Sequence, residues 1–304
     1  MLPSAVAGAF LGALAFYPVL RLPSRIRTPL LALDIAALAC APLLVRPEHP
    51  ALRFIAALFS VAWCVKLADL HIGAKRGSSP TFVDFVLFLF NPCSIVFRKQ
   101  NESPAPSAGE LGRRMLVNTL KALVAGAAAY GVFQIDWRAW PFFLEHSVKA
   151  VAFFVCLIPL SAVVGALGRL CGARGLDFMQ APLLATTPAK FWLRYNRPTQ
   201  QFFYEDIFLP FGGLRKPLRG LAIVFILSAL VHEILFVVIL GKIQGYQTVF
   251  FLLQGAAVAL TWRLRPRGFS AVVALALTWL FNLSSSMLFF ASVNCMVAFY
   301  VPRG

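Results

Sequence analysis

The sequence has few charged residues. Asp, Glu, Lys and Arg make up 13% of its 304 residues, whereas hydrophobic residues make up 60%. A soluble globular domain averages about 25% charged residues, so this composition leaves too little polar surface to cover a soluble fold of this size. With a mean hydropathy of +0.77, the chain is predicted to be an integral, multi-pass membrane protein. Its length suits a single membrane domain over residues 1–304.

Sequence signatures of metal, disulfide and nucleotide chemistry are missing as well. The six cysteines form no C-x-x-C pair, which disfavours a zinc site or a disulfide framework. The sequence has no H-E-x-x-H motif, no histidine-box array and no acidic pair suited to magnesium, and it lacks G-x-S-x-G and Walker A patterns. We therefore expect no metal and no permanently bound cofactor, and we disfavour serine hydrolases and nucleotide hydrolases.

Acidic residues are also scarce relative to basic ones. The chain carries 28 Lys and Arg against 12 Asp and Glu, a formal net charge of +16. Cytoplasmic loops of membrane proteins collect Lys and Arg, which accounts for much of the excess; recruitment of an anionic cosubstrate or a lipid headgroup is the alternative. Because the basic residues are spread among short loops, we do not expect a nucleic-acid partner.

Long apolar runs predict membrane-spanning helices, since about 20 residues cross the hydrocarbon core. These runs cover residues 2–20, 28–45, 51–70, 115–134, 147–168, 221–240, 248–262 and 269–301. The last run suits either one tilted helix or two short ones broken near Asn282. The sequence therefore predicts an all-α polytopic fold with about eight or nine transmembrane helices.

Loop charges predict the orientation of these helices. Three arginines between residues 21 and 27 mark the first loop as cytoplasmic, and Lys75 and Arg98 also fall in cytoplasmic loops. Lys75 and Arg98 can both be cytoplasmic only if the apolar segment 81–97 between them does not cross the membrane. We therefore predict a re-entrant or interfacial segment there. The same alternation places residues 136–145 outside, and residues 169–220 and 263–267 in the cytosol.

The segment 191–236 combines a polar, aromatic-rich stretch with an apolar helix. This helix carries His232 and Glu233 near its middle. A charge or an imidazole at bilayer depth costs roughly 2 to 4 kcal/mol, so such residues indicate a partner, a cavity or a reaction. The other three histidines are expected elsewhere: His49 and His146 in loops, and His71 at a helix end.

Two blocks in this segment carry a family resemblance. The first is Phe191-Trp192 followed by Arg194-Tyr195-Asn196-Arg197-Pro198, and the second is Ser228-Ala229-Leu230-Val231-His232-Glu233 within the apolar helix. Together they resemble the paired motif of the membrane-bound O-acyltransferases, in particular the wax-synthase-like branch. That pattern has an aromatic pair shortly before an Asn, and then a small residue, apolar residues and His-Glu inside a transmembrane helix. The motif region is residues 180–240.

The resemblance implies transfer of an acyl group from acyl-CoA, as cosubstrate, to a hydroxyl of a hydrophobic acceptor. It also implies tilted helices and interfacial helices around an intramembrane chamber that holds His232. A neutral imidazole can take the proton of an alcohol whose oxygen attacks a thioester, so His232 would be the general base. Asn196 matches the second functional position, where an amide can hold the acyl carbonyl or stabilise an oxyanion. Without the resemblance, a packed, hydrogen-bonded helix histidine is an equal interpretation.

Further residues around the motif are candidates for binding. The substrate-lining candidates are Phe191, Trp192, Tyr195, Ser228 and Glu233, and the candidates for the CoA phosphates are Arg215, Lys216 and Arg219. The aromatic residues could instead anchor an interfacial helix, and the basic ones could simply mark the cytoplasmic flank. Glu233 lies about 100° around the helix from His232, so we expect it to pair with a buried base or a backbone group.

Two other functions fit parts of the sequence. His232 and Glu233 could serve as the proton relay of a proton-coupled membrane transporter, or the chain could be a non-catalytic, lipid-binding relative. No inverted repeat is visible, which disfavours the transporter. The expected partners of the enzyme are acyl-CoA, the bilayer, and a hydrophobic alcohol or other hydroxyl acceptor. Arg outnumbers Lys, which hints at a GC-rich bacterial genome and hence the cytoplasmic membrane.

Overall fold

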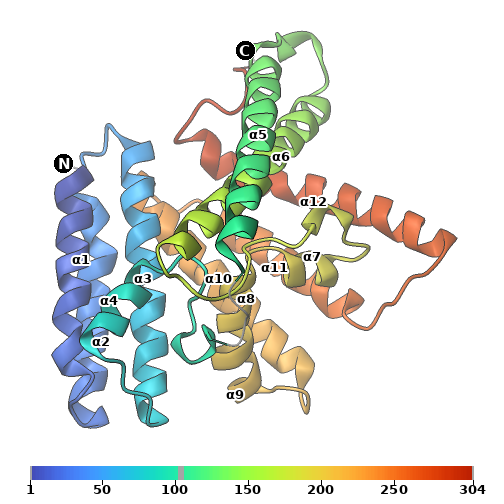
Figure 1. Cartoon of the computed structure of the whole chain (residues 1–304). Helices are drawn as coiled ribbons and strands as arrows, with labels where there is room; N and C mark the ends of the chain where they lie inside the picture. Colours follow the sequence, from blue (N-terminus) through green and yellow to red (C-terminus); the bar gives the residue numbers. More distant parts are fainter. Residues whose placement is uncertain (1, 102–105, 303–304) are drawn as a thin grey trace.

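The computed structural model describes residues 2–101 and 106–302, and this part of the chain forms helices and no strands (Figure 1). The longer helices are α1 (Leu2–Val19), α2 (Ser24–Cys40), α3 (Pro50–Lys75), α5 (Ala108–Gln134), α6 (Phe142–Leu170), α10 (Pro217–Leu240), α11 (Tyr246–Thr261) and α12 (Phe269–Asn294). The shorter ones are α4 (Phe82–Phe90), α7 (Pro188–Arg194), α8 (Arg197–Phe202), a π-helical turn (Phe203–Phe208) and α9 (Leu209–Phe211). Short 3-10 helices lie at Ala41–Leu44, Phe97–Lys99, Trp137–Ala139 and Pro182–Leu184. The predicted all-α fold is confirmed.

Seven of the described helices are long and apolar enough to cross a membrane. They are α1, α2 with its continuation to Leu44, α3, α5, α6, α10 and α12. The run at 248–262, predicted to be a further span, forms the shorter apolar helix α11 of 16 residues. The run at 269–301 forms one helix, which ends at Asn294. The chain is thus an integral multi-pass membrane protein.

The segment predicted not to cross forms the short helix α4. Its nine residues span about 14 Å, less than half of a hydrocarbon core. The buried Nζ of Lys66, on α3, donates hydrogen bonds to the carbonyls of Phe88 (2.6 Å), Leu89 (3.2 Å) and Asn91 (2.6 Å). A cation at the C-terminal end of a helix satisfies its last carbonyls and matches the helix dipole. Lys66 therefore fixes the point at which α4 ends.

A second buried cation joins the N-terminal helices to α10. Arg53, on α3, donates from Nε and Nη2 to the carbonyl of Val45, and from Nη1 to the carbonyls of Val238 and Ile239 at 3.4 Å. The last two carbonyls belong to the final turn of α10. Phe54 packs near Phe236 of the same helix, with ring centroids 6.5 Å apart. These contacts fix the C-terminal end of α10 against α3.

A buried ion network holds the motif region to α3. The guanidinium of Arg98 donates to Asp69 Oδ1 on α3 (3.0 Å) and to Asp206 Oδ1 in the π-helical turn (2.5 Å). Both carboxylate side chains have no exposed surface. The backbone N–H of Phe97 donates to the other oxygen of Asp69 (2.7 Å). One arginine thus connects two segments that are far apart in the sequence.

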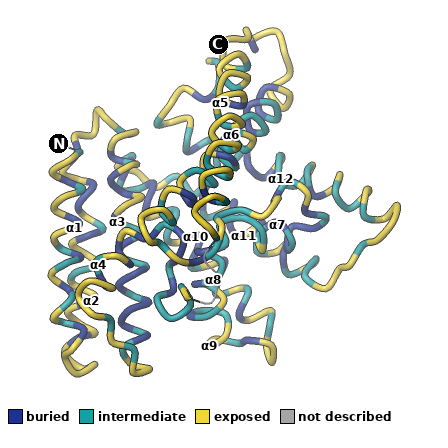
Figure 2. The backbone as a smooth tube through the Cα atoms, viewed as in Figure 1, coloured by how far each residue is buried: buried dark blue, intermediate teal, exposed yellow. Residues whose placement is uncertain are grey.

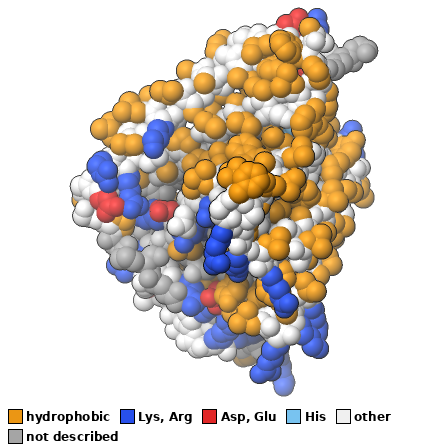
Figure 3. Space-filling view, turned by 90° about the vertical axis from the view of Figure 1, so that its right-hand side faces the viewer, with side chains coloured by type: hydrophobic (Ala, Val, Ile, Leu, Met, Phe, Trp, Pro, Cys, Tyr) orange, Lys and Arg blue, Asp and Glu red, His pale blue; other side chains and the backbone are white. Residues whose placement is uncertain are grey.

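The outer surface is largely apolar, as a lipid-facing surface requires. Along α5 only Leu111 and Ala125 are buried, while Leu116, Leu123 and other large apolar side chains are exposed (Figure 2). In Figure 3, hydrophobic side chains cover the centre of the face shown, and most Lys and Arg side chains lie in its lower and left parts. This separation is typical of a membrane protein whose basic loops lie on one side.

Replacing Arg98 with leucine should destabilise the fold strongly. The change would leave Asp69 and Asp206 buried without their shared cation, and breaking a buried ion pair costs about 3–5 kcal/mol. The measurement is the free energy of unfolding in mixed micelles titrated with a denaturing detergent. Arg113→Leu, which removes an exposed arginine, is the control. Equal stability of the two variants would mean that the network adds little to the fold.

Site-directed labelling should confirm the orientation. In a variant without native cysteines, a cysteine at Gly109 or Arg267 should react with a membrane-impermeant reagent from the cytosol, and a cysteine at Trp140 only from the other side. The motive is the loop charge pattern together with the short length of α4. If cysteines at Ser78 and Gly109 reacted from opposite sides, the segment between them would cross the membrane, and the orientation of every later helix would be reversed.

Candidate functional site

The imidazole of His232 lies within α10 and is oriented by its own helix. Its Nδ1 lies 2.8 Å from the carbonyl oxygen of Ser228, one turn earlier. A carbonyl oxygen only accepts hydrogen bonds, so in the neutral ring Nδ1 carries the proton and Nε2 carries the lone pair. Among the described residues, none forms a hydrogen bond with Nε2, and the side chain is half-buried. The arrangement presents a basic nitrogen that no residue of the described ranges bonds to.

One face of this imidazole is covered by α11. The ring centroid of Phe251 lies 4.1 Å from that of His232, at an interplanar angle of 36°. Phe251 also lies 5.9 Å from the ring of Trp192, on α7. Two predicted site residues, Trp192 and His232, thus lie near the same aromatic ring. Phe251 was not predicted, because a phenylalanine in an apolar run looks like any other core residue.

A chain of polar contacts holds Trp192 in place. Its indole Nε1 donates to Gln254 Oε1 on α11 (2.9 Å), and Gln254 Nε2 donates to Ser285 Oγ on α12 (2.9 Å). Gln254 is buried, and its amide satisfies both partners. The network ties α7 to two long helices. An isolated glutamine within a membrane-length apolar run was the only sign of it in the sequence.

The other predicted aromatic residues pack inside the protein. α7 begins after Thr187, whose hydroxyl accepts the N–H of Lys190 (3.1 Å), as expected of a Thr-Pro helix start. Phe191 and Tyr195 stack with centroids 5.4 Å apart. Both also contact Phe154 on α6, with centroids 6.4 and 6.1 Å away. Burial raises the pKa of the Tyr195 phenol, so this hydroxyl stays protonated at neutral pH.

Asn196 forms the turn between α7 and α8. Its backbone is left-handed, with φ 44° and ψ 58°, a conformation that asparagine adopts more readily than most residues. Its carbonyl accepts the N–H of Gln200 (3.0 Å), and the next residue, Arg197, donates its N–H to the carbonyl of Phe178 (2.8 Å). No hydrogen bond joins the Asn196 amide to His232 or to any other described residue. The turn thus explains an Asn at this position whether or not its amide takes part in chemistry.

The two remaining lining candidates, Ser228 and Glu233, form hydrogen bonds within the protein. Ser228 contributes its carbonyl to His232, while its hydroxyl donates to the carbonyl of Val224 (2.9 Å). Both carboxylate oxygens of Glu233 accept hydrogen bonds from the start of α11, including the backbone N–H of Gly245 at 2.6 Å. The expectation that Glu233 pairs with a backbone group agrees with these contacts.

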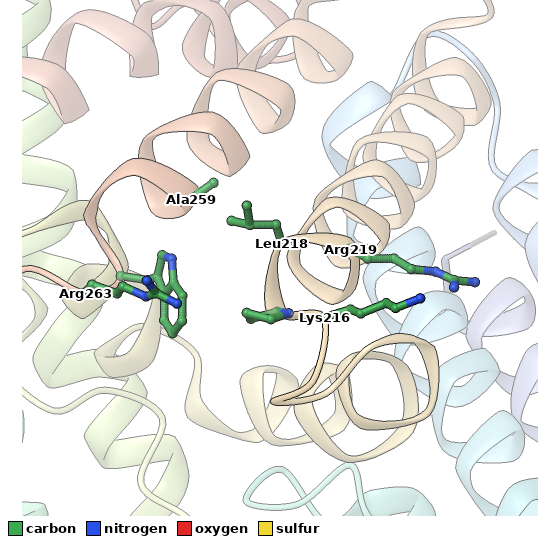
Figure 4. Close-up of a pocket in the computed structure, with 7 residues that line it drawn as sticks. Lys216, Leu218, Arg219, Ala259 and Arg263 are labelled. Atoms are coloured by element: carbon green, nitrogen blue, oxygen red, sulfur yellow. The ribbon is translucent and has the colours of Figure 1, made fainter.

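A basic pocket of about 380 Å³ lies where α10 begins and α11 ends. It is lined by Lys216, Pro217, Leu218, Arg219, Ala259, Trp262 and Arg263. Two of the three predicted phosphate-binding residues line it, and Arg215 does not. In Figure 4, Lys216 and Arg219 extend in the same direction, away from Arg263 on the other side of the pocket. Arg263, which stacks over Trp262 at 4.6 Å, was not predicted.

One histidine lies deeper than expected. His146 is fully buried within α6 rather than in a loop, and its ring nitrogens contact Tyr300 Oη (2.7 Å), the carbonyl of Leu283 (2.8 Å) and Ser286 Oγ (3.0 Å). α6 begins at Phe142, earlier than predicted, because its polar first turns are buried: Lys149 pairs with Glu145 (2.7 Å). His71 lies near the end of α3, as predicted, where it is buried and accepts a hydrogen bond from Arg27 Nε (3.0 Å).

No metal centre is formed by the part of the chain that the structure describes. Within it, no three or more His, Cys, Asp or Glu side chains gather in a way that could hold a metal ion. His146 and His71 are instead engaged by hydroxyl, carbonyl and guanidinium groups. Of the three histidines that lie within long helices, His232 is the one with a ring nitrogen that no described residue bonds to, and we take it as the centre of the candidate site.

Comparison with protein families places this site in a known context. Residues 130–297, more than half of the chain, match the MBOAT, membrane-bound O-acyltransferase family. The match includes both motif blocks and four of the long helices, α6, α10, α11 and α12. No curated protein matches the chain. The helical membrane fold and the extent of this match show that the chain belongs to the membrane-bound O-acyltransferase family.

Proposed function

We propose that this membrane-bound O-acyltransferase moves an acyl group from acyl-CoA to the hydroxyl of a hydrophobic acceptor, with His232 as general base. The observation that carries the proposal is the hydrogen bond between His232 Nδ1 and the Ser228 carbonyl. This bond fixes the tautomer and leaves the lone pair of Nε2 free to accept a proton. A structural histidine satisfies both of its nitrogens, as His146 does.

The proposed reaction proceeds by direct attack. The acceptor hydroxyl gives its proton to Nε2 as its oxygen attacks the thioester carbonyl, and a tetrahedral intermediate forms. When this intermediate collapses, the C–S bond breaks, the ester is released, and the imidazolium returns the proton to the CoA thiolate. In line with the family resemblance, we assign the Asn196 amide to the oxyanion of the intermediate, where one donor is worth about 3–4 kcal/mol of barrier.

We assign the CoA phosphates to the basic flank at the start of α10. Lys216 and Arg219 line the pocket, and Arg215 lies next to them in the sequence. From Arg219 to His232 the distance along the axis of α10 is about 20 Å. An extended pantetheine arm has a similar length, so a CoA bound at the flank could present its thioester at the imidazole. Charge-assisted hydrogen bonds from Lys and Arg are well suited to phosphate groups.

The chemical class proposed for the acceptor rests on the sequence motif. The resemblance of this motif to that of wax synthases favours a hydrophobic alcohol that enters an intramembrane chamber from the bilayer, with Phe191, Trp192 and Tyr195 near the path of the alcohol. We propose a single multi-pass domain over residues 1–304, located in the cytoplasmic membrane if the source is bacterial.

The transporter alternative is weakened by Glu233, because a proton relay must change protonation, whereas this carboxylate is held by four donors. A non-catalytic, lipid-binding relative would bind acyl-CoA without forming an ester.

Replacing His232 tests the general base. His232→Ala and His232→Gln should each lower turnover by about 10² or more while acyl-CoA still binds, because general-base catalysis contributes that much. The measurement is ester formation by purified protein, with acyl-CoA binding measured separately. Neither change should prevent folding, since alanine favours helices and glutamine remains polar. Wild-type turnover in His232→Ala would show that another residue accepts the proton.

Replacing Asn196 separates a catalytic amide from a turn residue. Asn196→Gly removes the amide but suits the positive φ of 44°, whereas Asn196→Ala also strains the turn by about 1–2 kcal/mol. If the amide stabilises the oxyanion, both variants should lose turnover by about 10²–10³. Only the alanine variant should also be less stable to heat. Full turnover in Asn196→Gly would show that Asn196 serves only to form the turn and not to stabilise the oxyanion.

Neutralising the basic flank tests the CoA site. Changing Arg215, Lys216 and Arg219 together to glutamine should raise the KM for acyl-CoA by about tenfold or more with little change in kcat, since each charged hydrogen bond contributes roughly 1.5–3 kcal/mol. The KM should also depend less on salt than in the wild type. Arg267→Gln, which changes an exposed arginine in the loop after α11, is the control. An unchanged KM in the triple variant would leave these residues a topological role only.

A further inference from the structure

The carboxylate of Glu233 is fully occupied by the start of the next helix. Its Oε1 accepts the backbone N–H groups of Gln244 (2.9 Å) and Gly245 (2.6 Å). Its Oε2 accepts the backbone N–H (3.2 Å) and the hydroxyl (3.1 Å) of Thr248. All four donors belong to the N-terminal end of α11, which begins at Tyr246. The side chain of one helix thus caps another.

The depth of Glu233 explains why this cap is needed. Glu233 precedes the last residue of α10, Leu240, by about two turns, or roughly 10 Å along the axis. The start of α11 therefore lies beside Glu233 rather than beside the last residues of α10. The first N–H groups of a helix have no partner within it, and leaving them unpaired in an apolar environment is costly. A carboxylate satisfies them and also matches the positive end of the helix dipole.

α11 carries one residue that contacts His232 and another that holds Trp192. Phe251 lies one turn beyond the capped residues, and its ring contacts the imidazole. Gln254 follows on the same buried side and bonds to Trp192. A rotation or axial shift of α11 would move Phe251 off the imidazole and Gln254 away from the indole. The position of the start of α11 therefore determines the geometry around the base.

We propose that Glu233 is a positioning residue: it fixes the N-terminal end of α11 and so holds Phe251 against His232. This assignment rests on the proposed role of His232 as base. It differs from the sequence-based assignment of Glu233 to the substrate lining, because a carboxylate with four protein donors has little capacity left for a substrate. It also gives a physical reason for the His-Glu pair: one residue carries the reactive nitrogen, and its neighbour orients the helix that packs on it.

Glu233→Gln tests the cap without removing the side chain. The amide keeps one acceptor oxygen but turns an NH₂ group toward backbone donors, and it loses the charge. Hydrogen–deuterium exchange of Gln244, Gly245 and Thr248 should become about tenfold faster or more, the effect of losing a charge-assisted hydrogen bond. Diethylpyrocarbonate should modify His232 faster as Phe251 moves away, while buried His146 serves as the internal control. Glu110→Gln, on α5, should change neither rate.

Kinetics of the same variant test the positioning role. The kcat should fall by about tenfold or more, with the KM for acyl-CoA and for the alcohol unchanged. A raised KM with normal kcat would show that Glu233 lines the substrate site instead. Unchanged hydrogen–deuterium exchange at Gln244, Gly245 and Thr248 would show that Glu233 does not cap α11. Faster exchange with normal kcat would show that the cap does not position the base. If the wild type formed no ester, the proposed function would fail, while exchange and His232 modification would still decide whether Glu233 holds α11.

Thr248 provides a milder variant if Glu233→Gln does not fold. Thr248→Val removes only the hydroxyl donor to Oε2, and Thr248→Ser retains it. Exchange at Gly245 and Thr248, and modification of His232, should increase in the valine variant by a smaller factor than in Glu233→Gln, and the serine variant should match the wild type. Equal rates in all three proteins would overturn the proposal.

Discussion

Ionisable side chains within the apolar helices have to be neutralised, and this structure neutralises three of them on the ends of other helices. Lys66 bonds to the last carbonyls of α4, Arg53 to the last carbonyls of α10, and Glu233 to the first N–H groups of α11. The cations lie at C-terminal ends and the anion at an N-terminal end, as the helix dipole favours. Each contact pairs a charge within an apolar helix with backbone groups that have no partner in their own helix.

The same helix-end contacts also position the helices that form the candidate site. Arg53 fixes one end of α10, Glu233 fixes the start of α11, and between them lies His232, whose Nδ1 is bonded to its own helix. The motif segment approaches from the other direction and is held by Gln254 and, further along, by Arg98. The imidazole is therefore oriented by rigid helices, with one nitrogen left for chemistry. Preorganisation of this kind is what a general base needs.

The sequence predicted the class of fold and the seven membrane-length helices, because length and hydropathy are local properties, but it counted the run at 248–262 as a further span. It also drew attention to His232 as a candidate base, since an imidazole in an apolar run is conspicuous, and to a short segment at 81–97, since loop charges required one. Contacts between segments that are distant in the sequence could not be predicted from it. Phe251 and Arg263 carry no local signal, and His146 was misplaced because the groups that satisfy it, Ser286 and Tyr300, come from the far end of the chain. Glu233 was expected to pair with a buried base or a backbone group, and that its partner is the start of α11 depended on the packing of α10 and α11.

We propose that this chain catalyses acyl transfer to a hydroxyl. The measurement that decides this is incubation of the purified wild-type protein, reconstituted in lipid nanodiscs, with radiolabelled acyl-CoA and a panel of hydrophobic alcohols. We expect a labelled ester and one free CoA thiol for each ester formed, with neither product in the absence of an acceptor. Binding of acyl-CoA without ester from any alcohol or other hydroxyl acceptor would contradict it.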